Sequence, residues 1–397
     1  MLNKKLKKIL IIHHGVGVGG GLIALLGLIE ELKEKNEVRV LSVFNSEAVG
    51  YIKKTGVKVY LPKSKFYNRF YGLFIHSEAS YFGIIEFLRN LKNLSTFFLN
   101  KYFFAKDELK YLNFEFEIVY LNSTFISDWS FAAKQLEKKT IIHVREPLAK
   151  GFLGIRKAIL RNTIKKYCDR VIAISFDNAI RIDLKEKTTV VYDPVVSKGR
   201  DATVENVSNP KLKYFLYLGG MQRIKGFEQL VNALPNLDKD VRIYFLGGDF
   251  TTSKSKLKRV ISYIDPYMWR INSLINRLNK SDKVIKLGLI DNIFVYYRNS
   301  IGLLSPFSKP HASLPVLEAF SVGKPVIVSD VEGMDEIVND KNGLFFKNND
   351  PKALAIAING MASLGSSDYQ IMSQNAKSKY IDIVNNNGIV QLVIDRV

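Results

Sequence analysis

The sequence predicts an α/β protein of two domains, each with a parallel β-sheet covered by helices on both faces. Short apolar segments typical of strands alternate with segments of helical periodicity along most of the chain, and this alternation is typical of parallel strands joined by helices. The length of 397 residues favours two such domains over one. A polar interval at 193–213, which contains two prolines, is the candidate linker between them.

The order of the expected elements defines the domains. The first half is expected to hold strands at 8–14, 38–44, 57–61, 117–123, 140–146, 170–175 and 189–195. The second half is expected to hold strands at 214–220, 241–248, 284–288, 301–307, 326–330 and 343–346. Helices are expected between them, among others at 22–34, at 226–234 and between 326–330 and 343–346. We assign an N-terminal domain to 1–205, a C-terminal domain to 206–370 and a last helical segment to 371–397.

Composition narrows the possible partners and the compartment. The net charge of +20 favours an anionic partner, such as nucleic acid, an acidic membrane leaflet or a phosphorylated substrate. No zinc-ligand spacing or aromatic RNA-binding string is present, so nucleic acid is not expected as a partner. Cys168 is the single cysteine, which excludes an internal disulfide and fits a reducing cytoplasm. No apolar run reaches the ~18 residues that a membrane-spanning helix needs.

The segment 287–346 is the most informative part of the chain. An apolar strand leads into a polar loop, after which Ser313 and Pro315 open a short helix at 314–322. The first amides of a helix lack internal partners, and the helix dipole favours an anion there. This helix start is therefore a suitable seat for a diphosphate. Glu318 lies just inside the helix, where a carboxylate can bind sugar hydroxyls.

Three strings of this segment occur in the same order in a known family. They are PVLEA at 315–319, GKPVI at 323–327 and EIV at 336–338. In this respect the chain resembles the retaining GT-B glycosyltransferases of family 4. The resemblance implies a GT-B fold, in which two Rossmann-like domains face each other across a cleft and the last helix packs back on the N-terminal domain. It also implies transfer of a sugar from a UDP- or GDP-sugar with retention, without a metal and without another cofactor.

The resemblance also assigns residues to the donor diphosphate. Lys225, which precedes Gly226, matches the family lysine. The family arginine falls five residues earlier, where this chain has Gly220, and Arg223 is expected to supply that charge from a shifted position. A cation on the diphosphate neutralises the leaving group as the glycosidic bond breaks.

Further donor-binding residues are expected around the 314–322 helix. Glu318 is expected to bind the ribose hydroxyls. Many family members carry a second glutamate eight residues before it, and Pro310 stands there in this chain. His311 is the candidate to replace part of that sugar contact. The other donor-binding residues that the resemblance implies here are Ser313, Leu314, Pro315 and Val316.

The glycine-rich loop after the first strand leaves three interpretations open. Residues 15–20 satisfy the GxGxxG pattern between a strand and a helix, which is the fingerprint of dinucleotide binding. That fingerprint also expects an acidic residue at the end of the second strand, where this chain has Asn45 and Ser46. The glycines are otherwise explained by a tight turn alone. The resemblance implies close approach of the donor and the acceptor to the backbone at Gly19 and Gly20.

The string HVRE at 143–146 supplies the candidate residues of the N-terminal domain. It stands at the end of an expected strand, whose alternation places His143 and Arg145 on the same side. His143 is a candidate catalytic residue with Lys225 and Glu318, donating a hydrogen bond to a sugar hydroxyl or to the reacting centre. Arg145 is a candidate donor-binding residue. The alternative is that His143 is a buried histidine bonded to backbone.

The acceptor side is expected to involve a membrane surface. Residues 84–98 and 150–170 read as amphipathic helices with basic and aromatic side chains, which suit an anionic membrane interface or, alternatively, core packing with a solvated basic face. We expect a cytoplasmic enzyme, peripheral at the inner face of the cell membrane. Its expected acceptor is a glycan or a polyprenyl-diphosphate-linked glycan in cell-surface polysaccharide synthesis. The alternatives are a catalytically silent sugar-nucleotide-binding subunit, a GT-B sugar-nucleotide epimerase and an NAD-dependent oxidoreductase.

Overall fold

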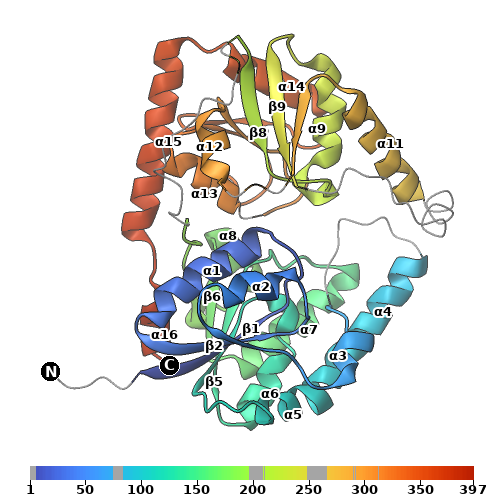
Figure 1. Cartoon of the computed structure of the whole chain (residues 1–397), viewed down its shortest axis with the longest axis vertical. Helices are drawn as coiled ribbons and strands as arrows, with labels where there is room; N and C mark the ends of the chain where they lie inside the picture. The colour runs from blue at the N-terminus through green and yellow to red at the C-terminus, as the bar shows by residue number, and fades with distance from the viewer. Residues whose placement is uncertain are drawn as a thin grey trace. The chain divides into compact units, whose positions relative to one another are not determined.

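The chain folds into two compact units. The computed structural model describes residues 6–74, 84–195, 209, 211–247, 266–288, 290, 292–311 and 313–397 (Figure 1). The described residues up to 195, together with 387–397, form the first unit, and those from 209 to 386 form the second. Each unit has its own parallel sheet and its own hydrophobic core, which confirms the predicted fold class of two parallel-sheet α/β domains.

The first unit is built on a seven-stranded parallel sheet in the order β3-β2-β1-β4-β5-β6-β7. Its strands are β1 (Lys7–His13), β2 (Asn36–Ser42), β3 (Lys58–Tyr60), β4 (Ile118–Leu121), β5 (Lys139–Val144), β6 (Arg170–Ala173) and β7 (Thr188–Val190). In register, Ile11 of β1 pairs with Val40 of β2 and with Tyr120 of β4. Strands β1 and β4 bury apolar side chains on both faces, as expected of a parallel sheet covered on both faces.

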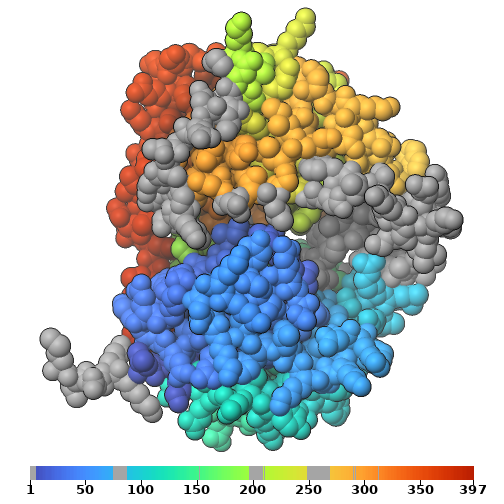
Figure 2. Space-filling view, in the orientation of Figure 1, coloured from blue at the N-terminus to red at the C-terminus, as the bar shows by residue number. Residues whose placement is uncertain are grey.

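Alternate residues of β1 show which helices cover which face of this sheet. Ile9 and Ile11 pack in one cluster and Leu10 and Ile12 pack in the opposite cluster, and each cluster lies against its own group of helices. The first group is α1 (Gly20–Lys33), α2 (Glu47–Lys53) and α16 (Val390–Asp395), of which α1 and α2 face the viewer in blue in Figure 2. The second group is α3 (Lys65–Arg69), α4 (Ile84–Leu99), the π-helical turn Asn100–Phe104, α5 (Ala105–Lys110), α6 (Trp129–Gln135), α7 (Ile155–Tyr167) and α8 (Phe176–Ile182).

The second unit has a six-stranded parallel sheet in the order β10-β9-β8-β11-β12-β13. Its strands are β8 (Lys213–Tyr217), β9 (Val241–Leu246), β10 (Val284–Leu287), β11 (Gly302–Ser305), β12 (Val326–Ser329) and β13 (Gly343–Phe346). One face packs on α9 (Phe227–Ala233), α11 (Pro266–Lys280) and α14 (Pro351–Ala362). The remaining helices are α12 (Ile293–Arg298), α13 (Leu314–Ser321) and α15 (Ser366–Asn386), and α15 packs against α13.

One expected element of the second unit is wrong. The sequence predicts a helix between β12 and β13, but residues 331–342 form a series of turns. Gly333 has a φ of +85°, in the left-handed region that interrupts a right-handed helix. The side chain of Asn342 then fixes the turn, because its Nδ2 donates to the Ile337 carbonyl at 3.2 Å and its Oδ1 accepts from the Asn339 amide at 2.8 Å.

The C-terminal segment divides between the two units. The expected boundary at 370/371 lies inside α15, which belongs to the second unit as far as Asn386. The chain then joins the first unit, where the Asn387 side chain exchanges hydrogen bonds with the Tyr192 backbone at 2.8 and 3.0 Å. Val390, Val393 and Ile394 complete the cluster under α1. Within the described ranges, no helix is long and apolar enough to span a membrane.

Candidate functional site

The strand order of each sheet predicts one position at which a ligand can bind. In a parallel α/β sheet, ligands bind beyond the carboxyl ends of neighbouring strands whose following helices lie on opposite faces. In the first unit these strands are β1 and β4, which lead to α1 and α6. In the second unit they are β8 and β11, which lead to α9 and α13. Lys225 follows β8, and the segment from His311 to Glu318 follows β11.

The loop after β8 is held in a shape that only glycine permits at one position. Gly226 has a φ of +81°, and a Cβ there would overlap the carbonyl oxygen of Pro306. The Tyr217 hydroxyl lies 3.2 Å from the Lys225 carbonyl oxygen, and the Ser308 amide donates to the Ile224 carbonyl at 2.9 Å. The loop that carries Lys225 is therefore fixed against the loop that follows β11.

The structure also explains the glycine where the family arginine was expected. Gly220 has a φ of +55°, and a Cβ there would lie 3.2 Å from the carbonyl oxygen of Gly247. Glycine is thus required at position 220 by the turn itself. Arg223, the proposed substitute, lies 3.9 Å from Glu228, measured from Nε to Oε2, and Glu228 also pairs with Arg270. The charge of Arg223 is consequently shared with a carboxylate of the protein.

Lys225 has the more informative electrostatic environment. It is half-buried, and burial lowers the pKa of its ammonium group. In the described part of the chain it forms no ion pair. A positive charge that is removed from water without a partner is costly, and an anion bound beside it would compensate that cost. Lys225 is therefore a candidate anion-binding residue.

The start of α13 offers fewer free amides than the sequence suggests. Ser313 precedes the helix, and no side chain caps its N terminus. Pro315 has no N–H, and the Val316 amide donates to the Ser313 carbonyl at 3.0 Å. The Leu314 amide has no acceptor among the described residues, and it lies at the positive end of the helix dipole. The Ser313 hydroxyl is buried and lies 3.3 Å from that of Ser305.

Glu318 is a buried carboxyl group on the first turns of α13. It is 7% exposed, and burial raises its pKa to about 7. The Tyr297 hydroxyl, from α12, lies 2.9 Å from its Oε2 and 3.0 Å from the Pro315 carbonyl oxygen. Among the described residues only Oε2 has a hydrogen-bond partner, so Oε1 is a candidate contact for a ligand. No sequence motif indicates that Tyr297 reaches Glu318.

His311 lies on the same loop as Ser313. Its ring stacks on that of Phe307, with 4.5 Å between ring centroids and 30° between the ring planes. Lys225, on the segment after β8, and His311 and Ser313, on the loop after β11, thus belong to two segments that are hydrogen-bonded to each other, and Leu314 and Glu318 lie on the helix α13 that follows the second. Across the described residues, no three His, Cys, Asp or Glu side chains gather in a way that could hold a metal ion.

In the glycine-rich loop of the first unit, the described residues give no steric reason for glycine at position 19 or at position 20. A Cβ at either position would meet no atom within 4 Å. Gly19 has an extended backbone with a φ of −158°, and no side chain caps the N terminus of α1. Among the described residues, neither steric contact nor backbone strain explains these glycines, and the approach of a ligand to them stays a prediction.

His143 and Arg145 lie in one buried cluster at the carboxyl end of β5. His143 is 2% exposed, and its Nδ1 lies 2.7 Å from the Tyr120 hydroxyl and 3.2 Å from Arg145 Nη2. Arg145 is 7% exposed, donates from Nε to Asn122 Oδ1 at 2.9 Å and forms an ion pair with Asp193. The ring of His143 is thus bonded to side chains rather than to backbone.

Sequence reasoning did not assign the partners in this cluster. Asn122 follows β4, and Asp193 was placed at the edge of the candidate linker. The polar run Asn122–Ser123–Thr124 directly after an apolar strand is a signal that could have identified the first. Ser123 and Thr124 bind Glu146, with the Ser123 hydroxyl 2.8 Å from Oε1 and the Thr124 hydroxyl 2.9 Å from Oε2.

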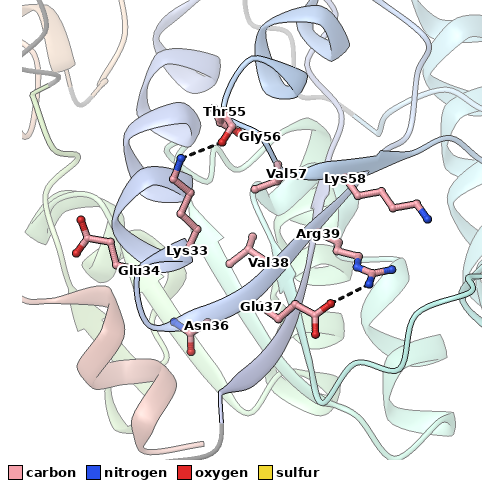
Figure 3. Close-up of a pocket in the computed structure, with 10 residues that line it drawn as sticks. All are labelled: Lys33, Glu34, Asn36, Glu37, Val38, Arg39, Thr55, Gly56, Val57 and Lys58. Carbon is pink, nitrogen blue, oxygen red and sulfur yellow. Dashed lines mark hydrogen bonds and ion pairs between the residues drawn. The ribbon is translucent and has the colours of Figure 1, made fainter.

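A hollow of about 560 Å³ lies elsewhere in the first unit (Figure 3). It is lined by the amino-terminal half of β2, the start of β3 and the end of α1, so it lies at the edge of the sheet opposite to His13 and His143. Its charges are largely satisfied by neighbours, since Lys33 Nζ donates to the Thr55 carbonyl at 2.9 Å and Arg39 pairs with Glu37 at 2.8 Å. It has no residue in common with the candidate site.

Comparison with known proteins agrees with the fold. The family Glycosyl transferases group 1 matches residues 200–379, a range that includes Lys225 and α13. An uncharacterized glycosyltransferase, MJ1069, of Methanocaldococcus jannaschii is 24% identical over 269 residues, which are 60% of this chain and 64% of that protein. An uncharacterized 41.2 kDa protein in the cps region of Klebsiella pneumoniae is 24% identical over 274 residues, which are 64% of this chain and 69% of that protein.

Solved structures show that the whole chain has the GT-B fold of glycosyltransferases. Anabaena Alr3699/HepE in complex with UDP and glucose has a TM-score of 0.72 at 15% identity, covering 98% of both chains. Sucrose-phosphate synthase from Thermosynechococcus elongatus has a TM-score of 0.65 at 16% identity, covering 95% of this chain and 94% of the other. The chain spans 64% of MJ1069, slightly less than two thirds of the length of that relative.

Proposed function

We propose that this chain is a glycosyltransferase that transfers a hexosyl group from a nucleotide-diphosphate sugar to a glycan or lipid-linked glycan, with retention of anomeric configuration. The observation that carries the proposal is the half-buried Lys225, whose charge has no partner in the described chain. The helix start at Leu314 and the buried carboxyl group of Glu318 follow β11, which pairs with β8, the strand that precedes Lys225. A diphosphate attached to a ribose fits both kinds of group, because the phosphates are anions that Lys225 and the helix start can bind and the ribose hydroxyls can donate to Glu318.

A UDP-sugar is the preferred donor, with a GDP-sugar as the alternative. Anabaena Alr3699/HepE, a structural neighbour, was solved with UDP-glucose. In the proposed complex Lys225 and the Leu314 amide bind the diphosphate, and Glu318 accepts hydrogen bonds from the ribose hydroxyls through its free oxygen. His311 and the Nε2 atom of His143 are proposed to contact the sugar.

The proposed reaction needs no general base and no metal from the protein. The bond between the anomeric carbon and the diphosphate oxygen breaks while the acceptor oxygen bonds to the same carbon from the same face. The acceptor hydroxyl proton passes to the departing phosphate oxygen, so atoms and charge balance. Lys225 and the helix dipole stabilise the negative charge that develops on the leaving group. Pro310 in place of a carboxyl group is compatible with this route.

A panel of nucleotide sugars tests the donor class. We expect UDP-sugars to raise the melting temperature of the protein, because a ligand that binds only the folded state stabilises it by mass action. Burial raises the pKa of Glu318 to about 7, and the ionised form accepts hydrogen bonds from ribose. The stabilisation should therefore be larger at pH 8 than at pH 6. The variant Glu318→Gln should bind the donor more weakly and lose this pH dependence.

Each rival reading predicts a different result in the same experiment. A silent subunit would be stabilised by the donor but show neither transfer nor hydrolysis. An epimerase would convert the donor without an acceptor, and an oxidoreductase would respond to NAD instead. Absence of stabilisation by every UDP- and GDP-sugar at either pH would refute the proposal.

We further propose that the acceptor is presented at an anionic membrane surface, in the synthesis of cell-surface polysaccharide, with the protein bound to the cytoplasmic face. On α4 the side chains of Phe87, Leu88 and Leu91 are 50–57% exposed, although a folded domain normally buries such groups. Leu153, before α7, is 81% exposed. A structural neighbour is a lipopolysaccharide outer core galactosyltransferase, which supports a surface glycan as the acceptor.

Sedimentation with lipid vesicles tests this attachment. The protein is expected to sediment with vesicles containing phosphatidylglycerol and to remain in solution with purely zwitterionic vesicles. Replacing both Leu88 and Leu91 with serine should reduce sedimentation at least about tenfold, because each loses apolar area from the interface. Equal sedimentation of the double variant and the parent protein would contradict the attachment through α4.

A further inference from the structure

Two buried histidines at the carboxyl edge of the first sheet each keep one ring nitrogen unpaired. His13 ends β1 and is 4% exposed, and His143 is the penultimate residue of β5 and is 2% exposed. In both rings Nδ1 has a partner, whereas Nε2 has none among the described residues. A buried polar group that has lost its hydrogen bonds to water and found no other partner destabilises the fold. Two such groups at one edge of a sheet indicate that a ligand supplies the partners.

The contact with Arg145 decides which nitrogen of His143 carries the hydrogen. A guanidinium group has only donors, so Arg145 Nη2, at 3.2 Å, requires His143 Nδ1 to be an acceptor. The Tyr120 hydroxyl, at 2.7 Å from the same nitrogen, is compatible with this because a hydroxyl can donate. The neutral ring then carries its hydrogen on Nε2, the unpaired atom.

The same arginine determines the tautomer of His13 through Asn122. Arg145 Nε donates to Asn122 Oδ1 at 2.9 Å, which fixes the orientation of the amide. The Asn122 nitrogen, which can only donate, therefore faces His13 Nδ1 at 3.1 Å. His13 must also carry its hydrogen on Nε2. A Cβ at Gly15 would overlap this nitrogen, so the unpaired N–H group faces the start of the glycine-rich loop.

Charge and burial keep both rings neutral. Burial, followed by the nearby His14 and Arg145, lowers the pKa of His13 to about 3. Burial, followed by Arg145, holds the pKa of His143 well below its ordinary value. Asp193 pairs with Arg145 Nη1 and compensates the guanidinium charge inside the fold.

We propose that Asp193, Arg145 and Asn122 act as positioning residues that hold His13 and His143 as neutral Nε2–H donors for oxygens of the bound sugar. The proposal rests on the glycosyltransferase function above and goes beyond it. It assigns His13 a contact with the ligand, and it gives Arg145 a role in orienting the two rings, because its guanidinium already contacts Asn122, His143 and Asp193. The two rings cannot then act as acids or bases; they bind and orient.

Nitrogen NMR of the full chain, labelled at its five histidines, tests the tautomers directly. Signals of His13 and His143 are assigned with the variants His13→Gln and His143→Gln. Both rings are expected to show a protonated Nε2 and an unprotonated Nδ1, without titration from pH 5.5 to pH 8. A ring that titrates near its ordinary pKa of about 6.5, or that carries its hydrogen on Nδ1, overturns the proposal. This measurement does not depend on any activity.

Two conservative variants test whether the tautomers of His13 and His143 affect the rate of sugar transfer. Asn122→Asp is isosteric and places a carboxylate oxygen opposite His13 Nδ1, which should move the hydrogen from Nε2 to Nδ1. Arg145→Lys keeps the charge beside Asp193 but cannot donate to Asn122 and His143 together. Each is expected to lower kcat at least about tenfold, while donor stabilisation of the folded protein changes less than about twofold.

Failure of the proposed function and failure of this inference give different results. If the parent protein binds no nucleotide sugar, the proposed function fails, and the assignment of a sugar ligand to the two rings is overturned with it. If the parent protein transfers sugar and Asn122→Asp moves the hydrogen without changing kcat by more than twofold, the inference alone is overturned. Full turnover in Arg145→Lys would likewise show that the forked geometry of Arg145 is not needed.

Discussion

Replacing Lys225 with methionine is expected to reduce kcat/KM for the nucleotide sugar by about 100-fold or more. A hydrogen bond to a charged group contributes about 1.5–3 kcal/mol, which corresponds to roughly 10- to 150-fold in affinity. The loss should be larger in turnover than in binding, because negative charge develops on the diphosphate as its bond to the sugar breaks. Isothermal titration with the donor and initial-rate measurements separate the two effects.

The same substitution is expected to make the unliganded protein more stable. Burial lowers the pKa of Lys225, so the folded state disfavours the ammonium form at neutral pH, and methionine removes that cost while keeping the apolar stem. The penalty is complete below the lowered pKa of the folded state, declines as pH rises above it, and is gone only above the ordinary pKa of lysine, where both the folded and the unfolded state are neutral. The gain in melting temperature should therefore be measurable at pH 7 and shrink toward pH 10.

Lys324 provides a matched control within the same unit. Burial lowers its pKa to about 8, but it lies between the end of α13 and the start of β12, at the amino edge of the sheet. Lys324→Met should raise stability in the same way and leave donor affinity unchanged. If Lys225→Met binds the donor as tightly as Lys324→Met does, Lys225 does not bind the diphosphate and the proposed site is wrong.

The sequence was sufficient for the fold because its signals are local. Helix α13 was expected at 314–322 and is found at Leu314–Ser321, since Pro315 and Gly323 mark its ends. The prediction of a helix after β12 was wrong because the local signal is ambiguous. Gly333 is compatible either with the end of a helix or with a turn, and the structure has a turn. The Arg223–Gly226 segment also shows what the sequence cannot predict. Its residues are recognisable in the sequence, but the reason for glycine at position 226 is the nearby carbonyl group of Pro306, which only the structure reveals.

The arrangement around the histidines could not be predicted in the same way. Its hydrogen bonds connect residues of β1, β4, β5 and the segment after β7, from His13 to Asp193. Each residue alone has an ordinary explanation, such as a polar end to a strand. The functional meaning arises only when the sheet order places β1, β4 and β5 side by side. The contact of Tyr297 with Glu318 is hidden for the same reason.

Replacing Gly20 with alanine is expected to change stability and activity in opposite directions. Gly20 is the first residue of α1, and a Cβ there would meet no protein atom within 4 Å. Alanine restricts the unfolded chain, so it should stabilise the fold by about 0.4–1 kcal/mol. If the donor or the acceptor lies against this backbone, the added methyl group should lower kcat/KM about 10- to 100-fold, as overpacking by about 1–3 kcal/mol implies.

The variant Gly50→Ala is a control that separates the effect of alanine on stability from its effect on kcat/KM. It lies within α2 of the same unit, and a Cβ there also meets nothing within 4 Å. Gly50→Ala should therefore raise stability by a similar amount, about 0.5–1 kcal/mol, and leave kcat/KM unchanged. An equal kcat/KM in both variants would mean that the glycine-rich loop only makes a turn. A selective loss in Gly20→Ala would mean that the open space above the N terminus of α1 is occupied during the reaction, because nothing else in the described chain approaches that position.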